Sequence, residues 1–427
     1  MIKIIKDRLS DREEIFSAVM EKVDVSATVK EIIEKVKAEG DAALYYYSEK
    51  FDKAKLTSLR VSEAEIEEAI GLVDPEFIEI LKEAAENIRV FHKEQKNDGF
   101  TIKKENGIVI GQKVIPVDRA GLYVPGGTAA YPSTVLMDAI PAKIAGVRRV
   151  VMVTPPDKAG KVNPVILAAA SVAGVDEIYK VGGSQAIAAL AYGTESVPKV
   201  DKIVGPGNAY VAEAKRQVFG EVSIDMIAGP SEIMIVADKN NRAKDIAADL
   251  LSQAEHDRMA SAVLVTDSEE LANAVSLELE RQIPTLERAE IARASIDNNG
   301  KIIITESLDS AVEIANGIAP EHLEISVDNP FFYLNKIRHA GSVFLGKNCP
   351  EAIGDYLAGT NHTLPTSGTA KFSSPLSVDD FVKKTQYIYY DREALGSVCR
   401  DVEFFANKEG LTAHARSATI RFEDENE

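Results

Sequence analysis

Short β-branched runs separated by helix-length segments constrain the fold of this chain more than any other feature of its sequence. Three such runs lie between Arg148 and Val204, at 150–153, 177–181 and 202–204. Each intervening segment is long enough for one helix, and this alternation is the pattern of parallel βαβ units. The sequence therefore predicts a doubly wound parallel sheet in this part of the chain.

A second series of runs starts after Gly229-Pro230. The chain has 427 residues, more than one hydrophobic core usually serves, so a second domain is expected. The runs lie at 233–237, 262–266, 302–305, 323–327 and 342–345. We therefore predict an α/β fold with two Rossmann-like parallel-sheet domains, a helical N-terminal segment and a C-terminal helical arm.

The first hundred residues are predicted to form acidic amphipathic helices. Ser62-x-x-Glu65 is a capping box, and Asp74-Pro75 places an N-cap and an N1 proline before another helix. After Ser374 the pattern becomes helical again and carries many aromatic residues. We expect this tail to pack on the body or on a neighbouring subunit.

A hairpin is predicted between the N-terminal helices and the first sheet. Residues 100–117 form two alternating runs on either side of Glu105-Asn106-Gly107. Asn-Gly between two such runs is a strong short-range hairpin signal.

Composition narrows the class of protein. The formal net charge of −18 argues against a nucleic-acid or anionic-membrane partner, because either would require a basic face. Cys349 and Cys399 are the only cysteines and do not form a C-x-x-C motif, so neither a disulfide framework nor a thiolate metal site is expected. With no secretory signal and no 18-residue apolar run, the expected location is the cytoplasm.

Three glycine-rich turns follow predicted strands, at 124–128, 181–185 and 204–208. In a parallel sheet these turns lie on the same carboxyl edge, where backbone N–H groups at helix starts can bind phosphate. None matches G-x-G-x-x-G or the P-loop pattern, so the sequence allows a dinucleotide site without the standard fingerprint. Ordinary glycine turns are the alternative.

The tetrad Ala319-Pro320-Glu321-His322 precedes the run at 323–327. It puts a carboxylate beside an imidazole, whose unperturbed pKa of about 6.5 allows proton transfer near neutral pH. The pair therefore suits acid–base catalysis. A loop histidine beside a solvated glutamate is the alternative that these residues leave open.

Gln253 and His256 are candidate metal ligands. They lie three residues apart in a predicted helix and so share one face. Asp355 and His414 could add an oxygen and a nitrogen ligand, a set suited to zinc or a similar divalent metal. Such spacing is also common on helix surfaces, and the role of His362 is ambiguous.

Taken together, seven motifs in order resemble histidinol dehydrogenase, and the resemblance spans nearly the whole chain. The motifs are GLYVPGG at 121–127, GPGNAYV at 205–211, IAGPSE at 227–232, LSQAEHD at 251–257, APEHL at 319–323, GDY at 354–356 and GTNHTLPT at 359–366.

The resemblance implies a homodimeric zinc enzyme of histidine biosynthesis that oxidises L-histidinol through L-histidinaldehyde to L-histidine with two NAD⁺. It implies one zinc ion per subunit, with Glu321 and His322 as the catalytic residues. The NAD contacts would be Tyr123, Gln185 and Asn208, and the zinc ligands Gln253, His256, Asp355 and His414. The substrate contacts would be Ser231, Gln253, His256, His322, Asp355, Glu409 and His414, with Glu409 and His414 donated by the partner subunit.

The same resemblance suggests a division into domains. Residues 119–230 would form the NAD-binding Rossmann-like domain, and 231–375 the Rossmann-like domain of the catalytic and zinc site. Residues 25–118 would be a helical and hairpin part of the domain continued in 231–375. Residues 1–24 would form the N-terminal helical segment, and 376–427 the helical arm that reaches the partner subunit.

Three other functions stay open on the residues. One is aldehyde oxidation through a thiohemiacetal on Cys349. Another is a zinc hydrolase in which Glu321 or His322 activates water, although H-E-x-x-H is absent. The third is a binding module without catalysis, in which Glu321-His322 has no chemical role.

Overall fold

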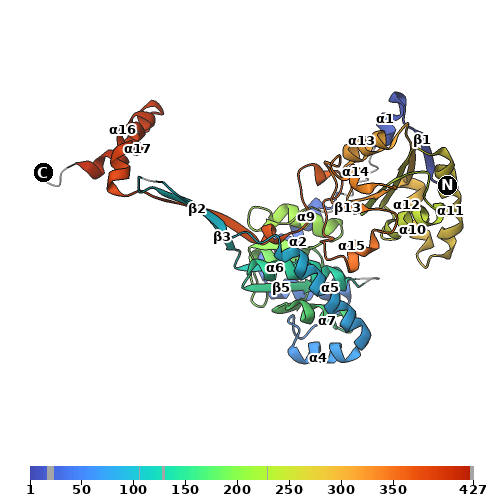
Figure 1. Ribbon diagram of the computed structural model, residues 1–427. Helices are drawn as coiled ribbons and strands as arrows, with labels where there is room; N and C mark the ends of the chain where they lie inside the picture. Colours follow the sequence, from blue (N-terminus) through green and yellow to red (C-terminus); the bar gives the residue numbers. More distant parts are fainter. Residues whose placement is uncertain (17–23, 105, 127–129, 228, 424–427) are drawn as a thin grey trace. The chain divides into compact units, whose positions relative to one another are not determined.

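The computed structural model describes residues 1–16, 24–104, 106–126, 130–227 and 229–423 (Figure 1). The chain divides into two compact units. The first comprises Met1–Gln95 and Val117–Phe381, and the second Lys96–Pro116 and Val382–Glu427. The predicted α/β class, with two Rossmann-like parallel sheets, is confirmed, and both of these sheets lie in the first unit.

A five-stranded parallel sheet forms first along the chain. Its order is β6-β5-β4-β7-β8. All but one of the residues of β5 and every residue of β6 and β7 are buried, as expected for strands covered by helices on both faces. The strands are β4 (Arg119–Tyr123), β5 (Arg149–Thr154), β6 (Glu177–Lys180), β7 (Lys202–Val204) and β8 (Ser223–Ile224).

Helices cover both faces of this sheet. On one face α4 and α5 pack on α6 and α7 around one apolar cluster, and on the other α2 packs on α8 and α9 around a second. The predicted grouping of residues 25–118 with 231–375 therefore differs from the packing, because the apolar faces of 25–88 are buried against the five-stranded sheet. The helices are α2 (Ser26–Glu39), α3 (Asp41–Tyr47), α4 (Glu63–Leu72), α5 (Pro75–Lys93), α6 (Pro132–Ala145), α7 (Pro164–Ala173), α8 (Gly183–Tyr192) and α9 (Ala209–Val218).

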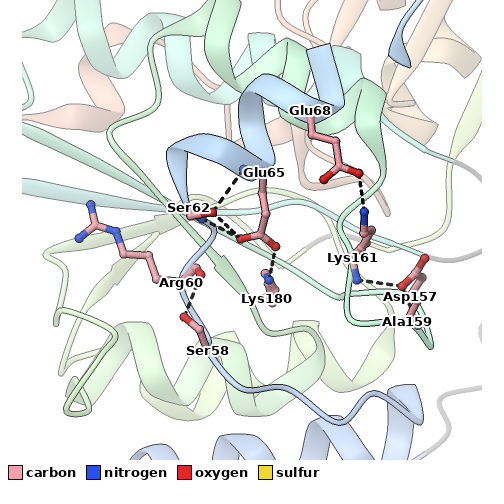
Figure 2. Close-up of polar contacts among 9 residues, drawn as sticks. All are labelled: Ser58, Arg60, Ser62, Glu65, Glu68, Asp157, Ala159, Lys161 and Lys180. Carbon is pink, nitrogen blue, oxygen red and sulfur yellow. Dashed lines mark hydrogen bonds and ion pairs between the residues drawn. The ribbon is translucent and has the colours of Figure 1, made fainter. Parts of the chain in front are cut away.

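The segment before α4 is fastened to the edge of this sheet (Figure 2). Val61 N–H donates to Ile178 O at 2.9 Å, and Lys180 N–H donates to Leu59 O at 2.7 Å. The predicted capping box is confirmed, since Ser62 Oγ accepts from Glu65 N–H while the Glu65 carboxylate accepts from Ser62 N–H. That carboxylate also pairs with Lys180. The capping residues thus join α4 to β6.

A six-stranded parallel sheet follows, in the order β1-β11-β10-β9-β12-β13. Five of its strands match the predicted runs. Its strands are β1 (Lys3–Lys6), β9 (Glu232–Ala237), β10 (Ser261–Thr266), β11 (Lys301–Ile304), β12 (His322–Ser326) and β13 (Ser342–Leu345). Its helices are α10 (Ala243–Ala254), α11 (Glu269–Gln282), α12 (Ala289–Asn299), α13 (Leu308–Ile318), α14 (Pro330–Leu334) and α15 (Ala352–Tyr356).

Strand β1 corrects the prediction that residues 1–24 are helical. Of the described residues in that range, Leu9–Asp11 and Arg12–Phe16 form helical turns, while Lys3–Lys6 pairs in parallel with β11. Ile5 is buried and Ile4 is exposed, the alternation of an edge strand. The pairing depends on a partner almost 300 residues away, so local pattern did not reveal it.

The second unit contains a three-stranded antiparallel sheet in the order β14-β3-β2 and, among its described residues, two α-helices. The predicted hairpin is confirmed by the pairing of β2 with β3, although Glu105 lies outside the described residues. Strand β14 was predicted to be helical and instead pairs along the whole of β3. The elements are β2 (Gly99–Lys103), β3 (Val109–Pro116), β14 (Val382–Tyr389), α16 (Arg392–Lys408) and α17 (Thr412–Thr419).

Within the described ranges, the helices include none that is both long and apolar enough to cross a membrane.

Candidate active site

Glu321 and His322 lie at the amino end of β12, beside the amino end of β9. His322 is paired in register with Ile233, so Glu321 and His322 adjoin Glu232, the first residue of β9. Glu232 N–H donates to Glu321 Oε2 at 2.9 Å, and Glu232 O lies 3.0 Å from His322 Nδ1. The peptide groups of one residue therefore orient both predicted catalytic side chains.

These contacts determine the tautomer of His322. A carbonyl oxygen can only accept a hydrogen bond, so Nδ1 must carry the proton and donate to Glu232 O. In the neutral ring Nε2 then has a free lone pair. Nε2 is buried, has no hydrogen-bond partner among the described residues, and lies 3.7 Å from Glu351 Oε1. His322 is thus arranged to accept a proton at Nε2.

Two of the carboxyl groups beside His322, those of Glu321 and Glu232, have raised pKa values. Burial raises the pKa of Glu321 well above its usual range, and the nearby charges of Glu232 and Asp355 add to the effect. Burial also raises the pKa of Glu232 to about 7. A carboxyl group with a raised pKa can exchange protons near neutral pH, as general acid–base catalysis requires.

A group of metal-ligating side chains adjoins the catalytic pair. Ligand atoms of His322, Glu351 and Asp355 all lie within 4.8 Å of one another. Gln253, at the end of α10, is 1 % exposed, and neither its Oε1 nor its Nε2 has a hydrogen-bond partner in the described part of the chain. Unpartnered buried polar atoms are costly, so this group of donors fits a bound cation.

His256 and Asp355 are in the charge states that metal ligands need. Burial lowers the pKa of His256 and so favours the neutral imidazole, while the charge of Asp355 acts in the opposite direction. Burial acts to raise the pKa of Asp355, but the hydrogen bond and charge of His362 outweigh it and bring this pKa down to about 2. A neutral imidazole and an ionised carboxylate both suit zinc.

Comparison with known proteins agrees with the fold and the site. Residues 17–422 match the model of the family described as histidinol dehydrogenase. The chain belongs to the histidinol dehydrogenase family. Its activity is therefore that of an oxidoreductase that acts on histidinol.

Relatives match over nearly the full length. A histidinol dehydrogenase of Clostridium acetobutylicum is 55 % identical over 427 residues, which cover 99 % of each chain. One of Bacillus cereus is 58 % identical over 401 residues, covering 94 % of this chain and 93 % of the relative. The crystal structure of the histidinol dehydrogenase from Elizabethkingia anophelis has a TM-score of 0.95 at 39 % identity, covering 100 % of this chain and 99 % of that one.

Family membership removes two of the alternative functions. A zinc hydrolase and a binding module without catalysis are both incompatible with a histidinol dehydrogenase, which is an oxidoreductase.

Sequence reasoning missed Glu351. Its side chain is 2 % exposed, Ser252 Oγ donates to its Oε2 at 3.0 Å, and its N–H donates to Glu324 Oε1 at 2.9 Å. Burial raises its pKa to about 7. It belongs to no spacing motif, and only its distance from His322 Nε2 reveals it.

The structure places the ambiguous His362 beside the candidate metal ligands. His362 Nδ1 lies 3.4 Å from Asp355 Oδ1, and its Nε2 lies 3.2 Å from Thr134 Oγ1. Both of its ring nitrogens thus have partners. The signal in the sequence was its place in the GTNHTLPT motif.

The three residues expected to contact NAD lie at the carboxyl edge of the five-stranded sheet. Tyr123 ends β4, and its hydroxyl accepts from Gly183 N–H at 3.1 Å. Gln185 is in the first turn of α8. Asn208 caps α9, with its Oδ1 accepting from Tyr210 N–H at 3.0 Å. Asn208 is exposed, whereas Tyr123 and Gln185 are buried.

Three expected substrate or metal contacts remain: Ser231, Glu409 and His414. Ser231 is partly buried and directly precedes β9. Glu409 follows α16 and His414 lies in α17, and both are exposed within the second unit. Two residues of the first predicted glycine turn, Gly127 and Thr128, fall outside the described residues.

Proposed function

We propose that this histidinol dehydrogenase uses zinc and two NAD⁺ to oxidise L-histidinol through L-histidinaldehyde to L-histidine, the final steps of histidine biosynthesis. The observation that carries the proposal is His322. Its Nδ1 is held by Glu232 O, while its Nε2 has no hydrogen-bond partner among the described residues and belongs to the group of candidate ligand atoms from His322, Glu351 and Asp355. A base with this fixed tautomer suits the removal of a hydroxyl proton.

The donor set supports zinc. Gln253, His256 and Asp355 offer an amide oxygen, a neutral imidazole nitrogen and an ionised carboxylate. We assign these three as ligands, with His414 of the partner as the fourth, and assign His322 to proton transfer, because a metal-bound Nε2 could not act as a base. When bound, zinc would orient the imidazole and amino nitrogens of the substrate.

In the first oxidation His322 Nε2 accepts the hydroxyl proton of histidinol while the carbon-bound hydrogen leaves as hydride, for which NAD⁺ is the acceptor. The ring can take this proton because its Nδ1–H remains bonded to Glu232 O. His322 must then release the proton before the second oxidation.

The second oxidation requires water. In its ionised form Glu321 takes a proton from a water molecule as the water oxygen adds to the aldehyde carbon, and it then passes that proton to the former aldehyde oxygen, which gives the hydrate. His322 accepts a hydroxyl proton of the hydrate while its carbon-bound hydrogen leaves as the second hydride, and the product is the carboxylic acid. Glu321 is 7 % exposed and bonded to Glu232 N–H, so its carboxyl group is held in place for this step.

The remaining roles follow the family resemblance. Tyr123, Gln185 and Asn208 contact NAD. Ser231, Gln253, His256, His322 and Asp355 contact the substrate. We propose a cytoplasmic homodimer in which Glu409 and His414 of one subunit complete the site of the other, Glu409 by neutralising the substrate ammonium group.

One assay tests the whole proposal. Protein, NAD⁺ and histidinol are mixed and NADH absorbance is followed, with and without a chelator. We expect two NADH per histidinol and loss of activity with the chelator. One NADH per histidinol would contradict the four-electron oxidation. Full activity after removal of the metal would contradict the zinc requirement. Loss of turnover in Cys349→Ser would favour the thiohemiacetal route instead.

A further inference from the structure

A buried ion pair forms hydrogen bonds to the turn between β7 and α9. Lys215 in α9 and Asp225 after β8 form this pair, and their side chains are 3 % and 1 % exposed. Asp225 Oδ2 accepts from Gly205 N–H at 2.8 Å, and Lys215 Nζ donates to Gly205 O at 3.0 Å. Both peptide groups of Gly205 are therefore bonded to the two charges.

Gly205 has a conformation that needs this support. Its φ is +110°, and a Cβ there would overlap the carbonyl oxygen of Tyr123. Asp138 approaches the same point, with its Oδ2 2.9 Å from the Cβ position. Glycine allows the close approach but is also the most flexible residue, so the backbone needs an external restraint.

The restraint leaves the following amides free. Among the residues that the structure describes, no acceptor is found for the N–H groups of Gly207, Asn208 and Ala209. Asn208 and Ala209 are exposed, whereas Gly205 is buried. The ion pair thus fixes the buried start of the turn, while its exposed end presents backbone donors beside Asn208.

We propose that Lys215 and Asp225 are positioning residues for the nucleotide: they hold the turn at Gly205 in the conformation that binds NAD. This inference rests on the proposed NAD site. A buried ion pair is weak evidence for stability, since apolar residues of similar volume often serve equally well. Apolar residues could not, however, bond to the N–H and the C=O of Gly205.

The first test compares Lys215→Met with a matched control. NADH affinity is measured by fluorescence titration of the purified enzyme. If the binding-competent turn falls to about a tenth of the population, the apparent Kd rises about tenfold. Lys199→Met serves as control, because Lys199, before β7, forms an exposed pair at 3.9 Å with Glu221, before β8, and its loss should leave the Kd unchanged.

A double variant separates positioning from stability. Lys215→Met with Asp225→Leu removes both charges of the pair, so neither is left buried without the other. We expect it to regain much of the melting temperature lost by Lys215→Met but none of the NADH affinity, with an unchanged KM for histidinol. Affinity that recovers together with stability would overturn the proposal, as would unchanged NADH binding in Lys215→Met.

Hydrogen exchange on the unaltered enzyme does not depend on any variant folding. The Gly205 amide should be protected without nucleotide, and the amides of residues 207–209 only once NADH is added. Protection of 205 only after NADH addition would overturn the proposal. If the wild type bound no NADH at all, the proposed cofactor would be wrong. If the wild type bound NADH and the Lys215 variants bound it equally well, the positioning role alone would fail.

Discussion

Replacing Gln253 by leucine should change stability in opposite directions with and without metal. Gln253 is 1 % exposed and lies beside the Glu351 carboxyl, yet neither its amide oxygen nor its nitrogen has a well-formed hydrogen bond in the described part of the molecule. An unpartnered buried polar group costs about 1–3 kcal/mol. Leucine has similar volume and no polar atom, so the metal-free variant should be more stable than the metal-free wild type by about that amount.

The expected size is measurable. For a chain of this length the melting temperature shifts by about 1 °C per kcal/mol, so in EDTA the variant should melt about 1–3 °C higher. Zinc at about a hundred times its Kd would stabilise the wild type by about 2.7 kcal/mol, but should stabilise the variant much less because one ligand is missing. Differential scanning calorimetry should therefore show the variant melting at the higher temperature in EDTA and the wild type melting at the higher temperature in zinc.

Gln217→Leu is the matched control. Gln217 Nε2 already donates to Ser26 O at 2.9 Å and to Glu213 Oε1 at 2.9 Å, so its loss should lower stability with or without metal. The reasoning about Gln253 is refuted if metal-free Gln253→Leu is less stable than wild type. It is also refuted if zinc stabilises the variant as much as the wild type.

Three other outcomes are expected. His322→Asn should slow oxidation of both histidinol and histidinaldehyde by about 10²–10⁴-fold, whereas Glu321→Gln should slow the aldehyde step more than the alcohol step. Single-turnover NADH formation from each substrate measures both effects, and rates equal to those of the wild type would contradict the assigned roles. Glu409→Ala should raise the KM for histidinol strongly with a smaller change in kcat in steady-state assays, and an unaltered KM would exclude the ammonium contact. Because burial raises the pKa of Glu351 to about 7 from 4.5, the folded protein binds the extra proton, so metal-free stability should fall by about 3 kcal/mol as pH rises from 4.5 to 7. Glu351→Gln should lose that part of the slope in melts at pH 5 and 7.5, and an identical slope would show that the carboxyl is not responsible.

Several elements could be predicted because their signals are local. The β-branched runs of the two parallel sheets, the Asn106-Gly107 hairpin and the Ser62–Glu65 capping box each depend on residues close together in the chain. Parallel pairing of β1 with β11 and antiparallel pairing of β14 with β3 depend on partners far away, and both were missed. An edge strand with mixed polar and apolar residues has no local signature that separates it from a helix.

For the site, the residue types were determined by the sequence, since the Glu321-His322 pair and the Gln253, His256 and Asp355 motifs can be recognised without coordinates. Only the tertiary structure decided the tautomer of His322, because the acceptor for its Nδ1–H is the carbonyl of Glu232 on a neighbouring strand. Only the tertiary structure shows that Glu351 lies beside His322 Nε2. The same holds for the hydrogen bonds between Gly205 and the side chains of Lys215 and Asp225. Proton position and charge state depend on which groups surround a side chain in space, and folding brings those groups from distant parts of the chain.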